Sequence, residues 1–254
     1  MSRYTSRTNT TPCILLYDLR GTTSQPWAPN IWRIRFILNY KRLRYQTVWL
    51  EFHDVENQLR AIGAPPSAFR VDRTPIYTLP VLVDPTKNAR APEILSNTNL
   101  IAEFLEATYP ARPVFPEGSR AMQTLFVHYI QEVFVQPLLP IMVPLSHPQF
   151  RGGTQGAYGG VVPNPLGGPQ QEQAWAQVKE QFDFLAMILD KNSGDGDATV
   201  AQGREVSYAD FSLCSVLIWI ERMAPHEVWA RIRAWNGGRW ARLHERCREY
   251  MDEL

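Results

Sequence analysis

The stretch Pro26-Trp27-Ala28-Pro29-Asn30 opens an apolar helical run at 29–41 and decides how the rest of the chain is interpreted. Pro29 suits the first position of a helix, where no backbone N–H is needed. Just upstream, Cys13-Ile-Leu-Leu-Tyr17 is an apolar run of strand length. A strand that leads through a loop into a helix N-terminus is where α/β proteins bind anionic ligands, because free N–H groups and the helix dipole are positive there. An ordinary strand–loop–helix without a ligand explains these residues equally well.

Composition indicates a soluble globular protein of one large domain or two modest ones. The chain has 254 residues, 44% of them hydrophobic and 20% charged, and a formal net charge of +1. This balance gives no sign of nucleic acid or an anionic membrane as a partner. The most apolar segment, 211–220, is too short to span a bilayer.

Three cysteines and a polar N-terminus predict a cytoplasmic protein. Cys13, Cys214 and Cys247 are few and far apart, which fits a reducing compartment and argues against a disulfide framework. Neither these cysteines nor the five histidines show the spacing of a metal site, so we expect no metal. The first ten residues lack the apolar core of a signal peptide.

Strand and helix patterns alternate in the first half of the chain. Strands are expected at 13–17, 45–50, 79–83 and 91–95, with helices at 29–41, 53–62 and 97–108. This order predicts a small sheet with flanking helices. After Pro113, Pro116 and Gly118 the patterns are helical only, at 119–135, 171–189, 208–223, 226–235 and 239–251. We therefore expect an α/β domain at 1–113 and an all-α domain at 119–254.

The segment 137–169 is rich in Pro and Gly and is predicted to be a loop between the first two of these helices. A loop of that length inside a compact domain is usually functional or mobile. It either covers a cleft or is a plain insertion.

Three short motifs carry the candidate chemistry. In Thr78-Leu79-Pro80 the proline begins a strand after a loop, a recurrent place for a cis peptide, although only about 5–6% of X–Pro bonds are cis. A cis bond would leave the backbone of Leu79 free to pair with an extended peptide. Asn97-Thr98 either caps a helix or adds a hydroxyl to free N–H groups in a carboxylate site. Ser207 and Asp210 have the spacing of a capping box and are interpreted as structural.

Taken together, these features resemble a cytosolic glutathione transferase. The resemblance covers nearly the whole chain and extends to the fungal, etherase-related FuA class of basidiomycetes. The stretches that carry it are Tyr17-Asp18, Trp27-Ala28-Pro29-Asn30, Gly63-Ala-Pro-Pro66, Tyr77-Thr-Leu-Pro80, Ile101-Ala-Glu-Phe-Leu105 and Trp235-Asn-Gly-Gly-Arg-Trp240.

This resemblance implies a thioredoxin-like N-terminal domain that binds glutathione as co-substrate, a helical domain with a hydrophobic ligand pocket, and a homodimer. Leu79 would pair with the cysteinyl backbone of glutathione ahead of a cis Pro80. Asn97 and Thr98 would hold the γ-glutamyl carboxylate; the family more often has an acid and Ser there, so Asn97 removes a negative charge near the glutamyl amine. Asn30 would point its amide toward the sulfur.

The sequence departs from the resemblance at Ala28, because related sequences typically have a Ser whose hydroxyl donates to the glutathione thiolate. Asn30 and backbone N–H groups could compensate in part. Thr22, Thr23 and Ser24 either offer a substitute hydroxyl or form a solvated turn.

We expect small aromatic or hydrophobic ligands beside glutathione, in a pocket lined by Trp27, Phe126 and Tyr129, although core packing also explains each of these residues. The expected chemistry is thiolate attack on an electrophile or aryl ether, weakened by Ala28. The alternative is a ligandin-type carrier of hydrophobic or polyphenolic molecules. A third possibility is a regulatory protein on the same fold, similar to the yeast nitrogen-regulation relative, whose long polar extension is missing here.

Overall fold

The N-terminal half is built on a four-stranded mixed sheet with the strand order β2-β1-β5-β6. The computed structural model describes residues 12–23, 25–150, 165–194, 196 and 198–252. Strand β1 (Ile14–Leu19) runs parallel to β2 (Tyr45–Leu50) and antiparallel to β5 (Val81–Asp84), which pairs antiparallel with β6 (Glu93–Ser96). The predicted thioredoxin-like arrangement is confirmed.

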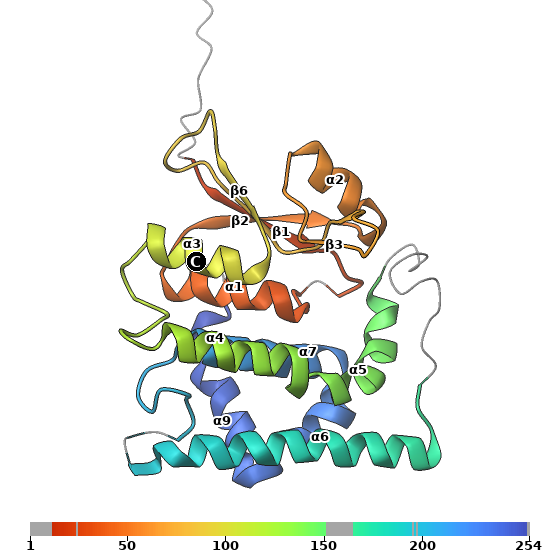
Figure 1. The fold of residues 1–254 in the computed structure, drawn as a ribbon. Helices are drawn as coiled ribbons and strands as arrows, with labels where there is room; N and C mark the ends of the chain where they lie inside the picture. Colours follow the sequence, from red (N-terminus) through yellow and green to blue (C-terminus); the bar gives the residue numbers. More distant parts are fainter. Residues whose placement is uncertain (1–11, 24, 151–164, 195, 197, 253–254) are drawn as a thin grey trace, which may run out of the picture.

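Two helices of this half lie between the sheet and the rest of the molecule (Figure 1). These are α1 (Pro29–Tyr40) and α3 (Thr98–Thr108), whereas α2 (Val55–Ala61) lies on the side away from the helical domain. A short hairpin of β3 (Ala68–Phe69) and β4 (Pro75–Ile76) was not predicted. Strands of two residues are too short to produce an alternating pattern.

The second half is helical, as predicted. Its helices are α4 (Arg120–Tyr129), α5 (Leu139–Ser146), α6 (Gly168–Leu189), α7 (Tyr208–Met223), α8 (Ala230–Ile232) and α9 (Arg239–Arg246), and α4 and α8 are joined to π-helical turns at Ile130–Phe134 and Pro225–Trp229. Short 3₁₀ turns occupy Phe52–Asp54, Gln136–Leu138, His147–Gln149, Asp190–Gly194, Trp235–Gly238 and Arg248–Tyr250.

The prediction of a continuous loop at 137–169 was wrong in its first part. Helix α5 and its flanking 3₁₀ turns occupy residues 136–149. Pro140 and Pro137 lie at the start of these elements, where a missing N–H costs nothing, and only Pro144 lies inside α5. Residues 151–164 of the segment lie outside the described chain.

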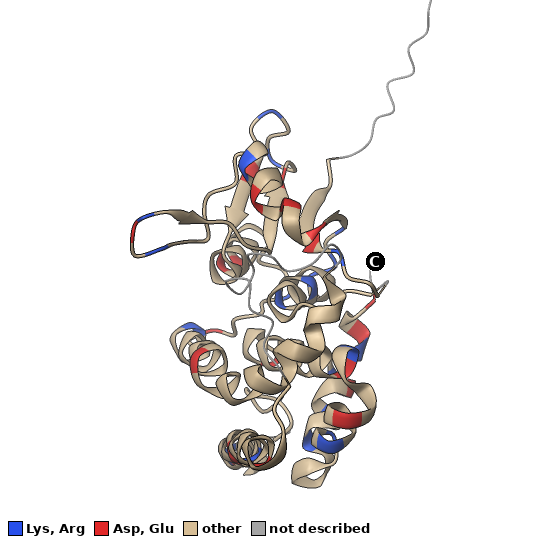
Figure 2. Ribbon diagram, turned by 90° about the vertical axis from the view of Figure 1, so that its right-hand side faces the viewer, with Lys and Arg blue, Asp and Glu red and all other residues tan. Residues whose placement is uncertain are grey.

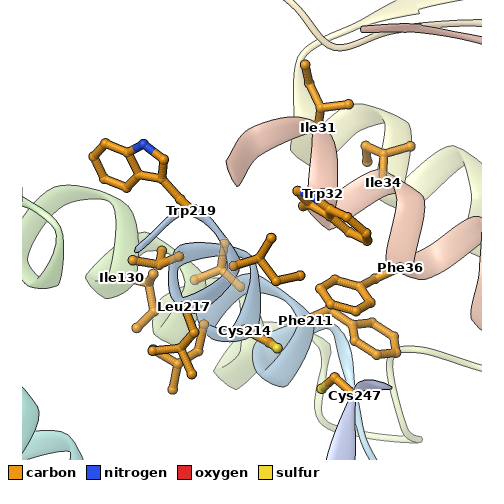
Figure 3. Packing of buried hydrophobic residues seen from close by; sticks show 14 of the residues in the cluster. Ile31, Trp32, Ile34, Phe36, Ile130, Phe211, Cys214, Leu217, Trp219 and Cys247 are labelled. Atoms are coloured by element: carbon orange, nitrogen blue, oxygen red, sulfur yellow. The ribbon is translucent and has the colours of Figure 1, made fainter. Parts of the chain in front are cut away.

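Helix α7 joins the two halves through an apolar contact with α1. Every residue of α7 from Tyr208 to Ile220 is buried, and so is every residue of α1 from Ile31 to Asn39. Phe36 stacks on Phe211, with ring centroids 5.1 Å apart and planes inclined by 8°. Figure 3 shows Trp32 and Phe36 of α1 pointing toward α7. The predicted capping box starts α7, with Asp210 accepting hydrogen bonds from the N–H and hydroxyl of Ser207.

Because α1 is buried on all sides, its arginines need internal partners. The Arg35 Nη2 donates to Asp18 Oδ2 at 2.8 Å and to Thr47 Oγ1 at 2.9 Å. Arg35 is 1% exposed and Asp18 is fully buried. This ion pair ties α1 to β1 and β2.

A second buried ion pair fixes the junction of the two halves. Lys41 Nζ lies 2.6 Å from Glu106 Oε2 and donates to the carbonyl oxygens of Tyr109 and Arg112 at 2.8 and 3.1 Å. The same carboxylate accepts the N–H groups of Val114 and Phe115. The chain that leads into the helical domain is therefore held by α1 and α3 together.

Among the residues that the structure describes, one helical stretch, Arg120–Gln149, is long and apolar enough to be a candidate membrane span. A single stretch of this kind is weak evidence for a membrane-spanning helix, since core helices of soluble proteins meet the same criteria of length and composition. It is divided here into two α-helices with π and 3₁₀ turns between them. Charges of both signs are interspersed on the face shown in Figure 2.

We predict that Lys41→Met lowers the free energy of unfolding by about 3–5 kcal/mol, because it leaves the buried carboxylate of Glu106 without a counter-charge. The measurement is chemical denaturation monitored by circular dichroism. Lys179→Met is the matched control: its exposed pair with Asp183, at 2.7 Å, should contribute less than about 1 kcal/mol. Equal losses of unfolding free energy in the two variants would contradict the conclusion that the Lys41–Glu106 ion pair stabilises the junction of the two halves.

Candidate functional site

The N-terminus of α1 lies beside a cleft and begins as the sequence predicts. Ala28 is the N-cap residue and its side chain makes no capping hydrogen bond. The N–H groups of Ile31 and Trp32 both donate to the Ala28 carbonyl, at 3.2 and 3.1 Å. Pro29 has no N–H. Within the described residues the N–H of Asn30 has no hydrogen-bond partner and is left to donate to a ligand, so this turn offers fewer free donors than the sequence suggested.

The Asn30 side chain is oriented by a neighbour one turn along the helix. Arg33 Nη2 donates to Asn30 Oδ1 at 3.0 Å. Because the oxygen is held, the amide N–H₂ group is the part left to face a ligand. Gln131 also accepts from both terminal nitrogens of Arg33, at 2.9 and 3.1 Å, when its amide is oriented with the oxygen toward the guanidinium.

The peptide bond between Leu79 and Pro80 is cis, as the resemblance implies. Within the described part of the chain, the backbone N–H and C=O of Leu79 have no hydrogen-bond partner. These two groups are the edge to which an extended peptide can bind.

The start of α3 is capped by its own sequence. Asn97, at φ 74°, is the N-cap, and its Oδ1 accepts from the N–H of Asn99 at 3.0 Å and of Leu100 at 3.4 Å. The cap interpretation of Asn97 is therefore correct, and its remaining polar group is the amide N–H₂. Thr98 follows as the first helical residue and is 7% exposed.

These three features line one cleft made of two adjoining hollows, of about 460 and 230 Å³. Asn30, Thr78 and Leu79 line both hollows. The larger one continues past Ala28 to further residues, namely Phe52, His53, Glu56, Arg70 and Tyr77. The smaller one is closed by Arg33, Pro80, Asn97, Thr98, Asn99 and Gln131. All six residues predicted to contact glutathione thus lie on this cleft.

Both halves of the chain match models of one known protein family. The family model of the glutathione S-transferase N-terminal domain matches residues 24–113, and that of the C-terminal domain matches residues 121–250. A solved glutathione S-transferase of Ceriporiopsis subvermispora, in complex with glutathione, is 32% identical with a TM-score of 0.83, over 94% of this chain and 98% of that chain.

The chain belongs to the glutathione S-transferase family. Glutathione transferase GSTFuA3 of Phanerochaete chrysosporium is 30% identical with a TM-score of 0.85, over 95% of this chain and 98% of that chain. The glutathione S-transferase-like protein ustS of Aspergillus flavus is 24% identical over 257 residues, which is 93% of this chain and 90% of that protein. The resemblance to fungal FuA transferases is confirmed.

The three residues predicted for the aromatic pocket are not part of this cleft. Trp27 is 5% exposed and packs edge-on against Phe150, with centroids 5.5 Å apart. Tyr129 instead faces α6, where its hydroxyl donates to Gln181 at 2.6 Å. Phe126 is a partly buried residue packed against the core. None of the three lines either hollow.

An aromatic group that the sequence analysis missed lies beside the cleft. Phe150 packs against both Trp27 and Phe52, with centroids 5.5 and 5.0 Å apart, and Phe52 lines the larger hollow. Gln149 holds this end of α5 to the loop before α1 by accepting from Thr22 Oγ1 at 2.8 Å. The sequence did contain a signal for this segment, because its prolines are spaced as they are at the starts of short helices. These prolines were interpreted as loop residues instead.

The loop hydroxyls considered as substitutes for the missing Ser are already engaged. Thr22 Oγ1 donates to Gln149 and Thr23 Oγ1 donates to the Gln25 carbonyl at 3.2 Å. Ser24 lies outside the described residues. In the part of the chain that the structure describes, no group of three or more His, Cys, Asp or Glu forms a metal-ligand cluster.

Proposed function

We propose that this protein binds glutathione along the cleft, with the cysteinyl backbone paired to Leu79. The observation that carries the proposal is the cis Leu79–Pro80 bond between the two hollows, with Asn30 on one side and the start of α3 on the other. The γ-glutamyl end would lie in the smaller hollow against Asn97 and Thr98. The glycyl carboxylate would lie in the larger one, which Arg70 and His53 line.

In this pose the sulfur of glutathione lies at the N-terminus of α1. The Asn30 N–H₂ group, its backbone N–H and the helix dipole all favour a thiolate there, because each places positive potential at the sulfur. The reaction is attack by the thiolate on an electrophile or an aryl ether, and the protein positions and stabilises the nucleophile. Phe52, which lines the larger hollow and packs against Phe150, supplies the apolar wall for the acceptor.

A ligandin-type carrier is the second candidate, and Ala28 is the observation that favours it. A methyl group stands where related sequences have a hydroxyl donor, and Thr22 and Thr23 do not replace it because they are bonded elsewhere. A hydrogen bond to a charged group contributes about 1.5–3 kcal/mol. The scaffold for binding is complete, whereas the activation of the thiol is weaker.

We also propose a cytoplasmic homodimer. The three cysteines are free, which fits a reducing compartment. Large apolar side chains are exposed on both domains: Phe69, 65% exposed, on the β3–β4 hairpin, and Met122 and Leu125, 66% and 60% exposed, on α4. A two-fold contact in which the hairpin of one copy meets α4 of the other would cover both patches.

Titration calorimetry with glutathione, followed by a conjugation assay with an aryl halide, tests the proposed function. We predict that the wild type binds glutathione with a dissociation constant in the micromolar-to-millimolar range. Thr98→Val should weaken this binding by about tenfold or more, because it removes the Thr98 hydroxyl that would donate a hydrogen bond to the γ-glutamyl carboxylate. Thr124→Val on α4 is the matched control and should bind normally. Binding without turnover favours the carrier, and no binding to the wild type refutes both functions.

Ala28→Ser is predicted to lower the pKa of the bound thiol by about one to two units, because one pKa unit corresponds to about 1.4 kcal/mol. The pKa is measured from the ultraviolet absorbance of the thiolate in the complex, and conjugation near neutral pH should rise with it. Ala28→Gly adds no donor and should leave the thiol pKa unchanged. An identical pKa in the Ser variant and the wild type would refute the role of the missing hydroxyl.

For the dimer, we predict that Phe69→Ser combined with Leu125→Ser shifts sedimentation velocity from dimer to monomer, because both changes place a polar group in the apolar contact. Met187→Ser on α6, where the residue is 51% exposed, is the control and should leave the dimer intact. A wild-type monomer at micromolar concentration contradicts the proposal.

A further inference from the structure

Helix α1 buries two arginines, and only one of them has an acidic partner. Arg35 is 1% exposed and is paired with Asp18, whereas Arg33 is 3% exposed and contacts the amide oxygens of Asn30 and Gln131. Within the described residues, Arg33 has no ion pair with a carboxylate. A buried charge without a counter-charge is costly, since neutral oxygens replace its hydration only in part.

Arg33 reaches the wall of the smaller hollow, where no acidic residue compensates it. The lining residues are Asn30, Arg33, Ser67, Ala68, Ile76, Thr78, Leu79, Pro80, Asn97, Thr98, Asn99 and Gln131. One of these is a cation and none is an anion. The hollow therefore has a net positive charge before any ligand binds.

The hydrogen-bonding groups of this hollow are mostly donors, because several of its acceptors are already occupied. Asn97 Oδ1 accepts from the N–H groups that start α3. Asn99 Oδ1 accepts from the Tyr208 hydroxyl at 2.9 Å, and Asn30 Oδ1 accepts from Arg33. The guanidinium, the Asn97 N–H₂ and the Thr98 hydroxyl remain as donors. Burial also lowers the pKa of Arg33 from its ordinary value.

Glutathione presents two opposite charges to this hollow in the proposed pose. Its γ-glutamyl end carries an α-carboxylate, which the donors and Arg33 suit, and an α-ammonium, which needs acceptors or an anion. The ammonium would meet a cation and no carboxylate. We therefore expect the α-ammonium of glutathione to add nothing to the binding free energy, or to make it less favourable.

Resting on the proposed function, we propose that the smaller hollow is a carboxylate subsite centred on Arg33 that does not select for the glutamyl amine. The ligand class it takes is a peptide thiol with a terminal carboxylate, whether or not an α-amino group is present beside that carboxylate. Arg33 acts both as the counter-charge of that carboxylate and as the residue that positions the amide of Asn30.

The test compares the binding of glutathione and of its des-amino analogue, glutaryl-cysteinyl-glycine, by titration calorimetry. The wild type should bind the analogue at least as tightly as glutathione. Asn97→Asp keeps a good N-cap residue and adds the anion, so it should shift the preference toward glutathione by about tenfold. Tenfold or more preference of the wild type for glutathione would overturn the inference.

Arg33→Met tests the cation itself, and a thermal melt of the same sample reports folding. Both peptides should bind at least about tenfold more weakly to it, whereas the exposed control Arg44→Met should bind them normally. Unchanged binding by Arg33→Met would overturn the role of Arg33. If Arg33→Met fails to fold, the wild-type comparison of the two peptides still decides the amine question. Failure of the wild type to bind either peptide refutes the proposed function and is distinct from binding with a preference for the amine.

Discussion

The complete burial of helix α1 is the constraint on which the rest of the structure depends. Residues 31–39 have the sheet on one side and α7 on the other, so each side chain needs an internal partner. The apolar ones pack, as Phe36 does on Phe211. Arg35 and Lys41 obtain the carboxylates of Asp18 and Glu106, which join the helix to β1 and to the interdomain junction. The position of its N-terminus, and of Asn30 with it, is thereby fixed.

The same constraint explains the composition of the cleft. One buried charge of α1, Arg33, has no carboxylate partner among the described residues, and it lies where the helix borders the smaller hollow. At the other hollow Ala28 offers a methyl group to the proposed sulfur position. In the proposed binding mode, the site therefore favours binding of an anionic peptide more strongly than it favours activation of the bound thiol. This imbalance is the physical basis for considering both a transferase and a ligand carrier.

Elements with long apolar runs or clear local caps could be predicted from the sequence. The helix opened by Pro29, the strand at 45–50 and the buried helix at 208–223 have apolar patterns or caps that involve only neighbouring residues. The Leu79–Pro80 and Asn97–Thr98 positions followed from the family resemblance. Contacts between distant segments could not be predicted, because nothing in the local pattern of Arg33, Gln131 or Phe150 shows which residues they meet. Helix α5 was missed because its prolines were interpreted as loop residues.

In the proposed complex, a peptide thiol lies along Leu79 with its sulfur at Asn30 and its γ-glutamyl end at Asn97 and Thr98. A crystal structure of the protein soaked with glutathione tests this most directly. We predict main-chain hydrogen bonds from Leu79 to the cysteinyl residue, the sulfur within hydrogen-bond distance of the Asn30 amide, and the γ-glutamyl carboxylate beside Thr98 and Arg33. Glutathione bound elsewhere, or an empty cleft at saturating concentration, would contradict it.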